Sequence, residues 1–229
     1  MKTQLNLLLA LALIVFASAC QNKSADDSST SGEALDIDET ASAMSASFAV
    51  DTQVSTVDWT GKKIVGDDSH TGKINISEGE FLVKDGALTG GNFTIDMASL
   101  TVTDLEAGNG KEKLEGHLKT GDFFEVEKFP TAKFEIASVS AVDTISGATH
   151  LIAGNLTMKE ATKSISFPAR VELMESSIVA TTLPFEINRT EWGVNYGSTL
   201  FGALKDKAIA DEVSVSIKLR GKITEEEVQ

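Results

Sequence analysis

The sequence of 229 residues holds a single cysteine, Cys20, and only three histidines. A chain with one cysteine cannot close an internal disulfide, so an exported form has to fold without one. The histidines are His70, His117 and His150, and their wide spacing contains neither HxH nor HExxH. Because protein zinc sites often show such spacings, the sequence gives no sign of a metal, and we expect no cofactor.

The recurrent motifs of several enzyme classes are also missing. The chain has no GxSxG nucleophile elbow, no P-loop and no GxGxxG. We therefore expect a protein that is not an enzyme, with an uncharacterised hydrolase as the weaker alternative. Basic residues are few, with 20 Lys and Arg against 34 Asp and Glu and a formal net charge of −14. That charge would repel a nucleic acid, so we expect no nucleic-acid partner.

The N-terminus has the composition of a signal peptide, residues 1–19. An apolar run from Leu5 to Phe16 follows a weakly basic start and is too short for a membrane-spanning helix. Ala17-Ser18-Ala19 then leads to Cys20, an ending that resembles the lipobox of bacterial lipoproteins, although Ala17 replaces the more usual leucine. This resemblance implies acylation of Cys20 and anchoring to a membrane. The alternative is a free thiol after a generic signal peptide.

Residues 20–50 are rich in Ser, Ala, Asp and Glu and have few large apolar side chains. Such a segment buries too little surface to offset the entropy of ordering it, so we expect a lipidated flexible tether. The folded domain is expected at 51–224, followed by a short acidic tail at 225–229. These features predict a protein of the bacterial cell envelope, anchored by lipid in the outer membrane on the periplasmic side or at the cell surface.

Apolar and polar residues alternate over most of the folded domain. Such alternation is typical of strands with one dry face and one wet face. We expect about eight strands in an all-β, lipocalin-like antiparallel barrel, because closure leaves no free sheet edge. One or two short helices, near 108–118 and 199–207, are expected at the mouth of the barrel. The residues predicted to face the interior are Phe93, Ile95, Met97, Phe134, Ile136, Phe185 and Ile187.

The stretch HLKTGDFFEVEKFPTAKFE, residues 117–135, is expected to contain a helix end, a corner and the start of a strand. Pro130 comes just before this strand, where its missing N–H is tolerated, and it favours an extended Phe129. Phe123, Phe124 and Phe129 would then plug the corner at the barrel mouth. Two interpretations stay open, a packed core corner and a contact with a ligand.

Three separated motifs occur between about Asp51 and Ile223. They are the stretch at 117–135, GNLTMKEATKSISFPARV at 154–171, and INRTEWGVNYGS followed by ADEVSVSIKL. In this combination the chain resembles the lipoprotein branch of the YceI family, also described as polyisoprenoid-binding or lipid-binding YceI-like domains. The resemblance implies a barrel around a long apolar tunnel, in which relatives bind isoprenoid lipids, and it implies no cofactor chemistry.

From this resemblance we expect a membrane-anchored lipoprotein that binds a long isoprenoid-type lipid, polyprenyl or quinone-like, for lipid storage, transport or stress response. A linear lipid gains about 0.8 kcal/mol for each buried CH₂-sized group, so affinity needs no catalytic machinery. The alternative is a structural or stress-related envelope protein without a specific ligand. The sequence leaves the oligomeric state open.

Arg189 is the most informative polar residue of the predicted interior. It continues the alternating run from Val179 to Ile187, so an unbroken strand would turn its side chain inward, where a cation could bind a lipid head group. The alternatives are a bulge that turns it outward and an ion pair with an acid. Trp192 and Tyr196 would bring rings with polar edges to the same end. The acids considered as partners are Asp122, Glu186 and Glu191.

Overall fold

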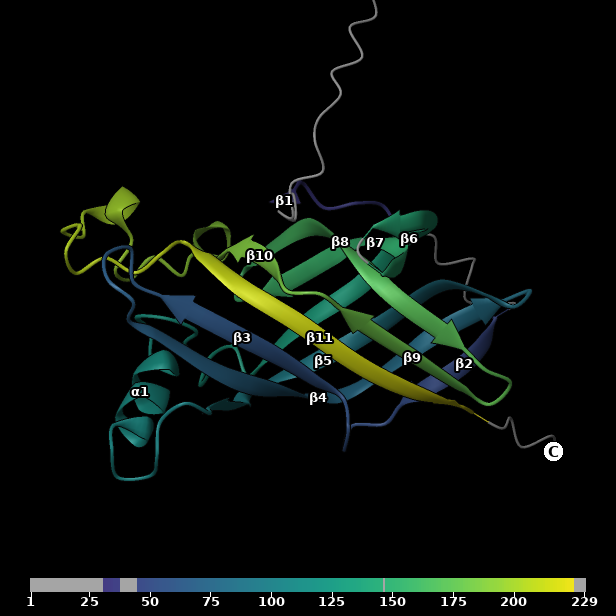
Figure 1. The fold of residues 1–229 in the computed structure, drawn as a ribbon, viewed down its shortest axis with the longest axis horizontal. Helices are drawn as coiled ribbons and strands as arrows, with labels where there is room; N and C mark the ends of the chain where they lie inside the picture. Colours follow the sequence, from purple (N-terminus) through teal and green to yellow (C-terminus); the bar gives the residue numbers. More distant parts are fainter. Residues whose placement is uncertain (1–30, 38–44, 146, 225–229) are drawn as a thin grey trace, which may run out of the picture.

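The computed structural model describes residues 31–37, 45–145 and 147–224 (Figure 1). The predicted signal peptide, Cys20 and the acidic tail therefore lie outside the described residues. Within those ranges, no helix is both long and apolar enough to cross a bilayer. The strands are β1 (Ser31–Gly32), β2 (Ala46–Val50), β3 (Thr56–Lys62), β4 (Ser69–Lys84), β5 (Ala87–Val102), β6 (Thr131–Ile145), β7 (Ala148–Met158), β8 (Ala161–Leu173), β9 (Ser177–Thr182), β10 (Phe185–Asn188) and β11 (Glu212–Ile223). The helices are α1 (Lys111–Leu118) and the 3-10 helices η2 (Arg189–Trp192) and η3 (Thr199–Phe201).

The sheet closes into a barrel. Strands β4 to β8 pair with their sequence neighbours in antiparallel fashion. Strand β11 closes the ring because it pairs with β3 on one edge and with β9 on the other. Strands β2 and β3 share one position between β4 and β11, and β9 and β10 share another beside β11. The antiparallel, lipocalin-like barrel expected from the alternating sequence is thus confirmed, and both of its predicted helical segments contain short helices.

The barrel begins a few residues before Asp51, the boundary expected from the sequence. Strand β2 pairs with β4 and β11, and Phe48 in its middle is 3% exposed. Further upstream, β1 pairs with β8, and the Asn155 side chain binds both the N–H and the carbonyl of Leu35 at 2.7 and 2.8 Å. The small and polar neighbours of Phe48 dilute the local hydrophobicity, which is why composition places the boundary too late.

One end of the barrel is filled by side chains. Phe48 and Phe81 face each other across the β2–β4 pair, and Ile178 enters from β9. Gly221 of β11 permits this close packing, since a Cβ there would lie 2.9 Å from both Phe81 and Ile178. With Val83 and its neighbours these side chains leave that end dry and closed.

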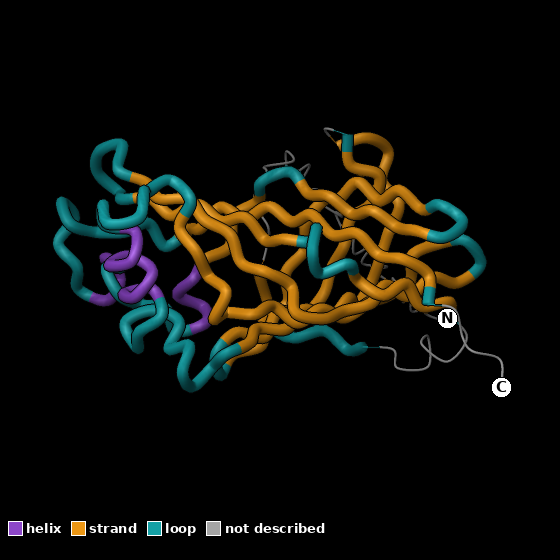
Figure 2. Tube along the Cα trace, turned by 90° about the horizontal axis from the view of Figure 1, so that it is seen from below, coloured by secondary structure: helices purple, strands orange, loops and turns teal. Residues whose placement is uncertain are grey.

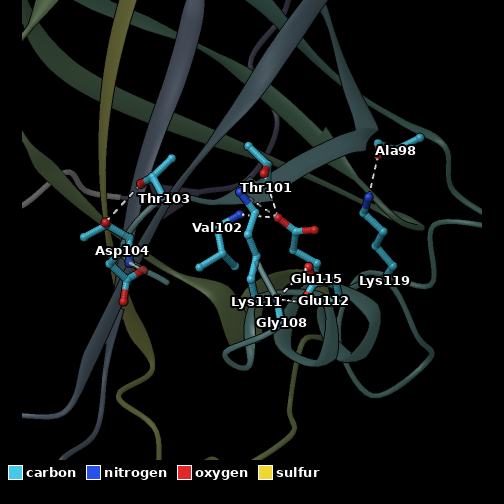
Figure 3. A network of polar contacts seen from close by, with 11 residues as sticks. Ala98, Thr101, Val102, Thr103, Asp104, Gly108, Lys111, Glu112, Glu115 and Lys119 are labelled. Carbon is cyan, nitrogen blue, oxygen red and sulfur yellow. Dashed lines mark hydrogen bonds and ion pairs between the residues drawn. The ribbon is translucent and has the colours of Figure 1, made fainter. Parts of the chain in front are cut away.

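Helix α1 lies at the other end of the barrel, where the helices gather (Figure 2). Its attachment to β5 is polar (Figure 3): Thr101 Oγ1 and the Val102 N–H both donate to Glu115, at 2.6 and 2.8 Å. The Thr101 and Val102 hydrogen bonds lower the pKa of the Glu115 carboxyl. This attachment therefore stabilises the fold above the ordinary pKa of a glutamate and is lost as the pH falls through the lowered value. Lys119 adds a hydrogen bond to the Ala98 carbonyl at 2.7 Å.

The contact between Trp59 and Gly72 offers a test of the barrel register. The two residues pair across β3 and β4, and a Cβ on Gly72 would lie 2.4 Å from the indole and 2.1 Å from the Thr101 carbonyl oxygen. Gly72→Ala should lower the free energy of unfolding by about 3 kcal/mol, because the backbone oxygen cannot move away cheaply. Urea denaturation measures the change.

Gly61→Ala is the matched control in the same hairpin, since a Cβ there meets nothing within 4 Å. It should change the stability by no more than about 0.5 kcal/mol. Equal stability of the two variants would contradict the register of β3 on β4.

Candidate functional site

The half of the barrel next to α1 contains a cavity of about 370 Å³. Its volume falls in the range of roughly 300–1,000 Å³ that small-molecule sites occupy. The walls come from strands β3 to β8, β10 and β11, and the mouth from α1, the loop after it and the β3–β4 turn. The site is therefore a pocket along the barrel axis rather than a groove on its surface.

Most of the residues predicted from sequence line this cavity. From that set the structure brings together Phe93, Ile95, Met97, Phe123, Phe124, Phe134, Phe185, Ile187 and Arg189. The apolar residues that the prediction omitted are Val57, Trp59, Ile74, Ile76, Leu100, Leu114, Leu118, Ala132, Leu156, Met158, Ile165, Phe167, Ile209, Val213, Val215, Ile217 and Leu219. Most of them belong to the same alternating runs, so assigning every second residue of each strand to the interior would have predicted them.

Aromatic rings lie against the wall of the barrel where glycines make room for them. The Trp59 indole lies over Gly72, and the Phe134 ring lies beside Gly154, where a Cβ would be 2.7 Å from its Cζ. The Phe134 ring occupies the space that Gly154 leaves free. Because the rings lie against the backbone, the space along the axis stays open.

The floor of the cavity is a cluster of phenylalanines. Phe167 and Phe185 stack with their ring centroids 4.5 Å apart at an interplanar angle of 11°. Phe134 contacts Phe167 at 5.6 Å, and Phe93 meets Phe81 of the filled end in an edge-to-face contact at 5.0 Å. These rings separate the cavity from the filled half of the barrel.

The rim of the mouth is polar. It is lined by Lys62, Lys63, Asp68 and His70, which come from the ends of β3 and β4 and from the turn between them. Lys63 pairs with Asp68, and His70 Nδ1 lies 2.9 Å from Asp104 Oδ2. An apolar chain could thus fill the cavity while a polar group stayed at the rim among hydrated side chains.

The corner after α1 covers part of the mouth. Phe123 packs against His117 and Tyr196, with centroid distances of 5.1 and 5.2 Å, and Lys159 Nζ donates to the Phe123 carbonyl at 3.1 Å. Phe124 also lines the cavity, whereas Phe129 lies outside it, under the Lys128 ammonium at 4.7 Å. The expected plug of three rings is therefore a plug of two.

Arg189 reaches the cavity wall, but its guanidinium is held by the protein. Nε donates to the Ala210 carbonyl at 3.0 Å, Nη1 to Val194 at 2.6 Å, and Nη2 to Ile209 at 3.3 Å. Asp211 Oδ1 lies 3.6 Å from Nη2, so the pairing acid is Asp211 and not one of the three acids considered. Burial lowers the pKa of Arg189, and Asp211 partly offsets that effect.

A change of parity between β9 and β10 shows that the run from Val179 to Arg189 is not one unbroken strand. In β9 the buried residues are Ile178 and Ala180, whereas in β10 Phe185 is buried and Ile187 lines the cavity. The segment between the two strands contains Pro184, which has no N–H to donate to the ladder. Strand β10 then ends at Asn188, so Arg189 begins η2 instead of continuing a strand.

Three other predicted residues are not part of the lining. Trp192 is 1% exposed and donates its indole N–H to the Leu156 carbonyl at 3.0 Å. Tyr196 is 46% exposed and contacts His117. Ile136 is buried in the core. Across the described ranges, no group of three or more His, Cys, Asp or Glu side chains is arranged to hold a metal ion.

Comparison with known proteins identifies the family to which this fold belongs. The sequence model of the YceI-like domain matches residues 48–220. A UPF0312 protein of Staphylococcus aureus (strain N315) is 25% identical over 136 residues, which are 56% of this chain and 75% of the relative. A UPF0312 protein of Pseudomonas aeruginosa (strain LESB58) is 32% identical over 80 residues, 35% of this chain and only 40% of that protein's length.

Two solved structures share the architecture. A polyisoprenoid binding domain from Saccharophagus degradans, implicated in plant cell wall breakdown, superimposes with a TM-score of 0.56 at 15% identity, over 79% of this chain and 99% of that one. BcnA of Burkholderia cenocepacia gives a TM-score of 0.53 at 19% identity, over 75% and 98% of the two chains. At these identities the likeness shows the fold alone.

Replacing Arg189 separates a structural role from a ligand contact. Arg189→Met should lower the free energy of unfolding of the empty barrel by about 3–5 kcal/mol, because it leaves Asp211 and several carbonyls buried without partners. Arg170→Met, which breaks an exposed pair with Glu172, should cost no more than about 1 kcal/mol. Chemical denaturation of both variants measures these two changes in stability. A fully stable Arg189→Met barrel would contradict the structural role.

Proposed function

Because this chain belongs to the YceI-like domain family, we propose that it binds one long isoprenoid-type lipid, polyprenyl or quinone-like, in the barrel cavity. The observation that carries the proposal is the cavity itself, which is apolar along its walls, closed by a phenylalanine floor and polar only at its mouth. The ligand class comes from the Saccharophagus degradans neighbour, a polyisoprenoid binding domain.

The apolar walls supply the affinity. Each buried CH₂-sized group contributes about 0.8 kcal/mol, so ten carbons of an isoprenoid chain contribute roughly 8 kcal/mol before the cost of ordering the lipid. Met97 and Met158 line the walls and can adapt to a methyl-branched chain, because their side chains are unbranched and flexible. Affinity of this kind needs no reacting group, which supports a binding protein rather than an enzyme.

The head group of the lipid belongs at the rim. Arg189 has little left to donate, since three of its nitrogens already bind carbonyls. Lys62 and Lys63 stand at the open end beside the His70 imidazole, and a phosphate or carbonyl oxygen there would meet ammonium groups that remain hydrated. We therefore assign the head-group position to the rim, in place of Arg189.

The proposed setting is the bacterial cell envelope, where the protein would store or transport the lipid or act in a stress response. Acylation of Cys20 would supply the anchor, and this residue lies outside the described part of the chain. A structural envelope protein with an empty barrel is the rival that the first experiment below distinguishes.

The first experiment identifies the bound lipid and blocks its site. Protein purified from its native membrane should carry one isoprenoid lipid per chain, detected by mass spectrometry. Ala132→Phe should lose that lipid, because Ala132 lines the cavity and a ring there would project into the open space. Leu151→Phe, at an exposed position of β7, should retain it. An empty wild-type barrel would refute lipid binding, and equal lipid content in the two variants would refute the cavity as the binding site.

The second experiment tests the anchor. Cells grown with labelled palmitate should incorporate the label into the wild-type chain, and Cys20→Ser should abolish it because the acyl acceptor is removed. Ser24→Ala, a few residues away, serves as the control and should keep the label. Label that persists in the Cys20→Ser variant would show that the anchor assignment is wrong.

A further inference from the structure

Large apolar side chains are exposed on two loops beside the cavity mouth. Leu200, Phe201 and Leu204 are 72%, 59% and 68% exposed, which makes them the most exposed large hydrophobic residues in the described ranges. Ile64 and Val65, in the β3–β4 turn, are also exposed. Burying such side chains in water-excluded surroundings is favourable, so a soluble protein seldom gathers them without a partner.

The two loops form one surface. The Ile64 N–H donates to the Ala208 carbonyl at 3.0 Å, and the Ala210 N–H donates to the Lys62 carbonyl at 2.8 Å. Lys63 and Ile209 form an isolated bridge between the same segments. We call residues 64–65 together with 200–204 the mouth surface.

The mouth surface is continuous with the cavity. Lys62 and Lys63 directly precede Ile64, Ile209 comes five residues after Leu204, and all three line the cavity. The loops lie at the same end of the barrel as α1 (Figures 1 and 2). A lipid that enters the cavity therefore passes beside these exposed apolar side chains.

The local charge also sets this end apart. Segments 62–68 and 199–207 together contain four lysines and three aspartates, whereas the whole chain has 34 acids and 20 bases. An anionic bilayer would repel most of the acidic surface of the protein. It would repel this end least, and the lysines could contact lipid phosphates around the apolar side chains.

The position of the N-terminal segment also supports a bilayer contact at this end of the barrel. Ser31 Oγ donates to Glu191 of η2 at 2.5 Å, and η2 begins with Arg189 of the cavity wall. Ser31 is eleven residues after Cys20, a reach of at most about 40 Å for an extended chain. An acyl anchor at Cys20 would thus keep this end of the barrel close to the bilayer.

We propose that the mouth surface docks on the lipid bilayer, so that the isoprenoid chain moves between the membrane and the cavity without crossing water. The inference rests on the proposed lipid binding and adds the direction from which the lipid arrives. Leu200, Phe201 and Leu204 enter the apolar layer, and the lysines beside them stay among the head groups.

The test uses the chain from Gln21 onward, without leader or acyl group, which contains every residue that the structure describes. Vesicles of phosphatidylethanolamine and phosphatidylglycerol carry a fluorescent polyprenol. Two quantities are measured: co-sedimentation of the protein with the vesicles, and the rate of polyprenol transfer into the protein. A variant combining L200S, F201S and L204S should lose co-sedimentation and slow the transfer about tenfold or more. Its affinity for polyprenol delivered from detergent should not change.

The control variant combines V54S, L151S and M174S, which remove as many exposed apolar side chains from other parts of the surface. It should match the wild type in both measurements. Transfer from vesicles at the wild-type rate in the L200S, F201S and L204S variant would overturn the docking proposal. A wild-type chain that dimerises through this surface and ignores vesicles would also overturn it. Failure of the wild type to take polyprenol from detergent would instead refute lipid binding, while co-sedimentation would still report on docking.

Discussion

The double pairing of β11 is the constraint on which the rest of the structure depends. Val57 of β3 faces Ile217 and Ala180 of β9 faces Leu219, so the described strands close into a ring whose radius is set by the number and stagger of its strands. A ring of fixed radius cannot collapse when its interior is underfilled. The cavity near α1 exists because the hydrogen-bonded wall resists the collapse that would otherwise fill it.

Inside that wall, the side chains fill one end of the barrel and leave a cavity at the other end. Phe81 and Ile178 pack the far end tightly over Gly221, while Phe134 lies beside Gly154 and leaves the axis open. Arg189 then fastens η2 to the segment before β11 through backbone carbonyls, so the rim keeps its shape when the cavity is empty. The polar groups that hold the mouth together are engaged with the protein itself, and the walls of the space that they frame are mostly apolar.

The sequence predicts the repeating parts of this structure better than its exceptions. Alternation such as that of Phe93 and Met97 is a local property, so the barrel and much of its lining follow from it. Arg189 reaches the cavity wall as expected, but it does so from η2 rather than from a strand, and no local periodicity marks Asp211 as its partner. The burial of Phe48 was not predicted, because it comes from pairing with strands far away in the sequence. Ile209 reaches the cavity from a loop, where no periodicity applies.

The contact between Leu35 and the Asn155 amide makes the N-terminal segment a releasable strap. Three side-chain hydrogen bonds hold it on the barrel, two between Leu35 and Asn155 and one from Ser31 to Glu191, together with the two residue pairs of β1. Each hydrogen bond is worth only about 1 kcal/mol. With the acyl anchor proposed at Cys20, the chain between the anchor and its first contact with the barrel ends at Ser31. Once the segment is released, this connection runs to Ala46, and the greatest length that an extended chain allows rises from about 40 to about 90 Å. A pull on the proposed acyl anchor would therefore release the N-terminal segment before it strained the barrel.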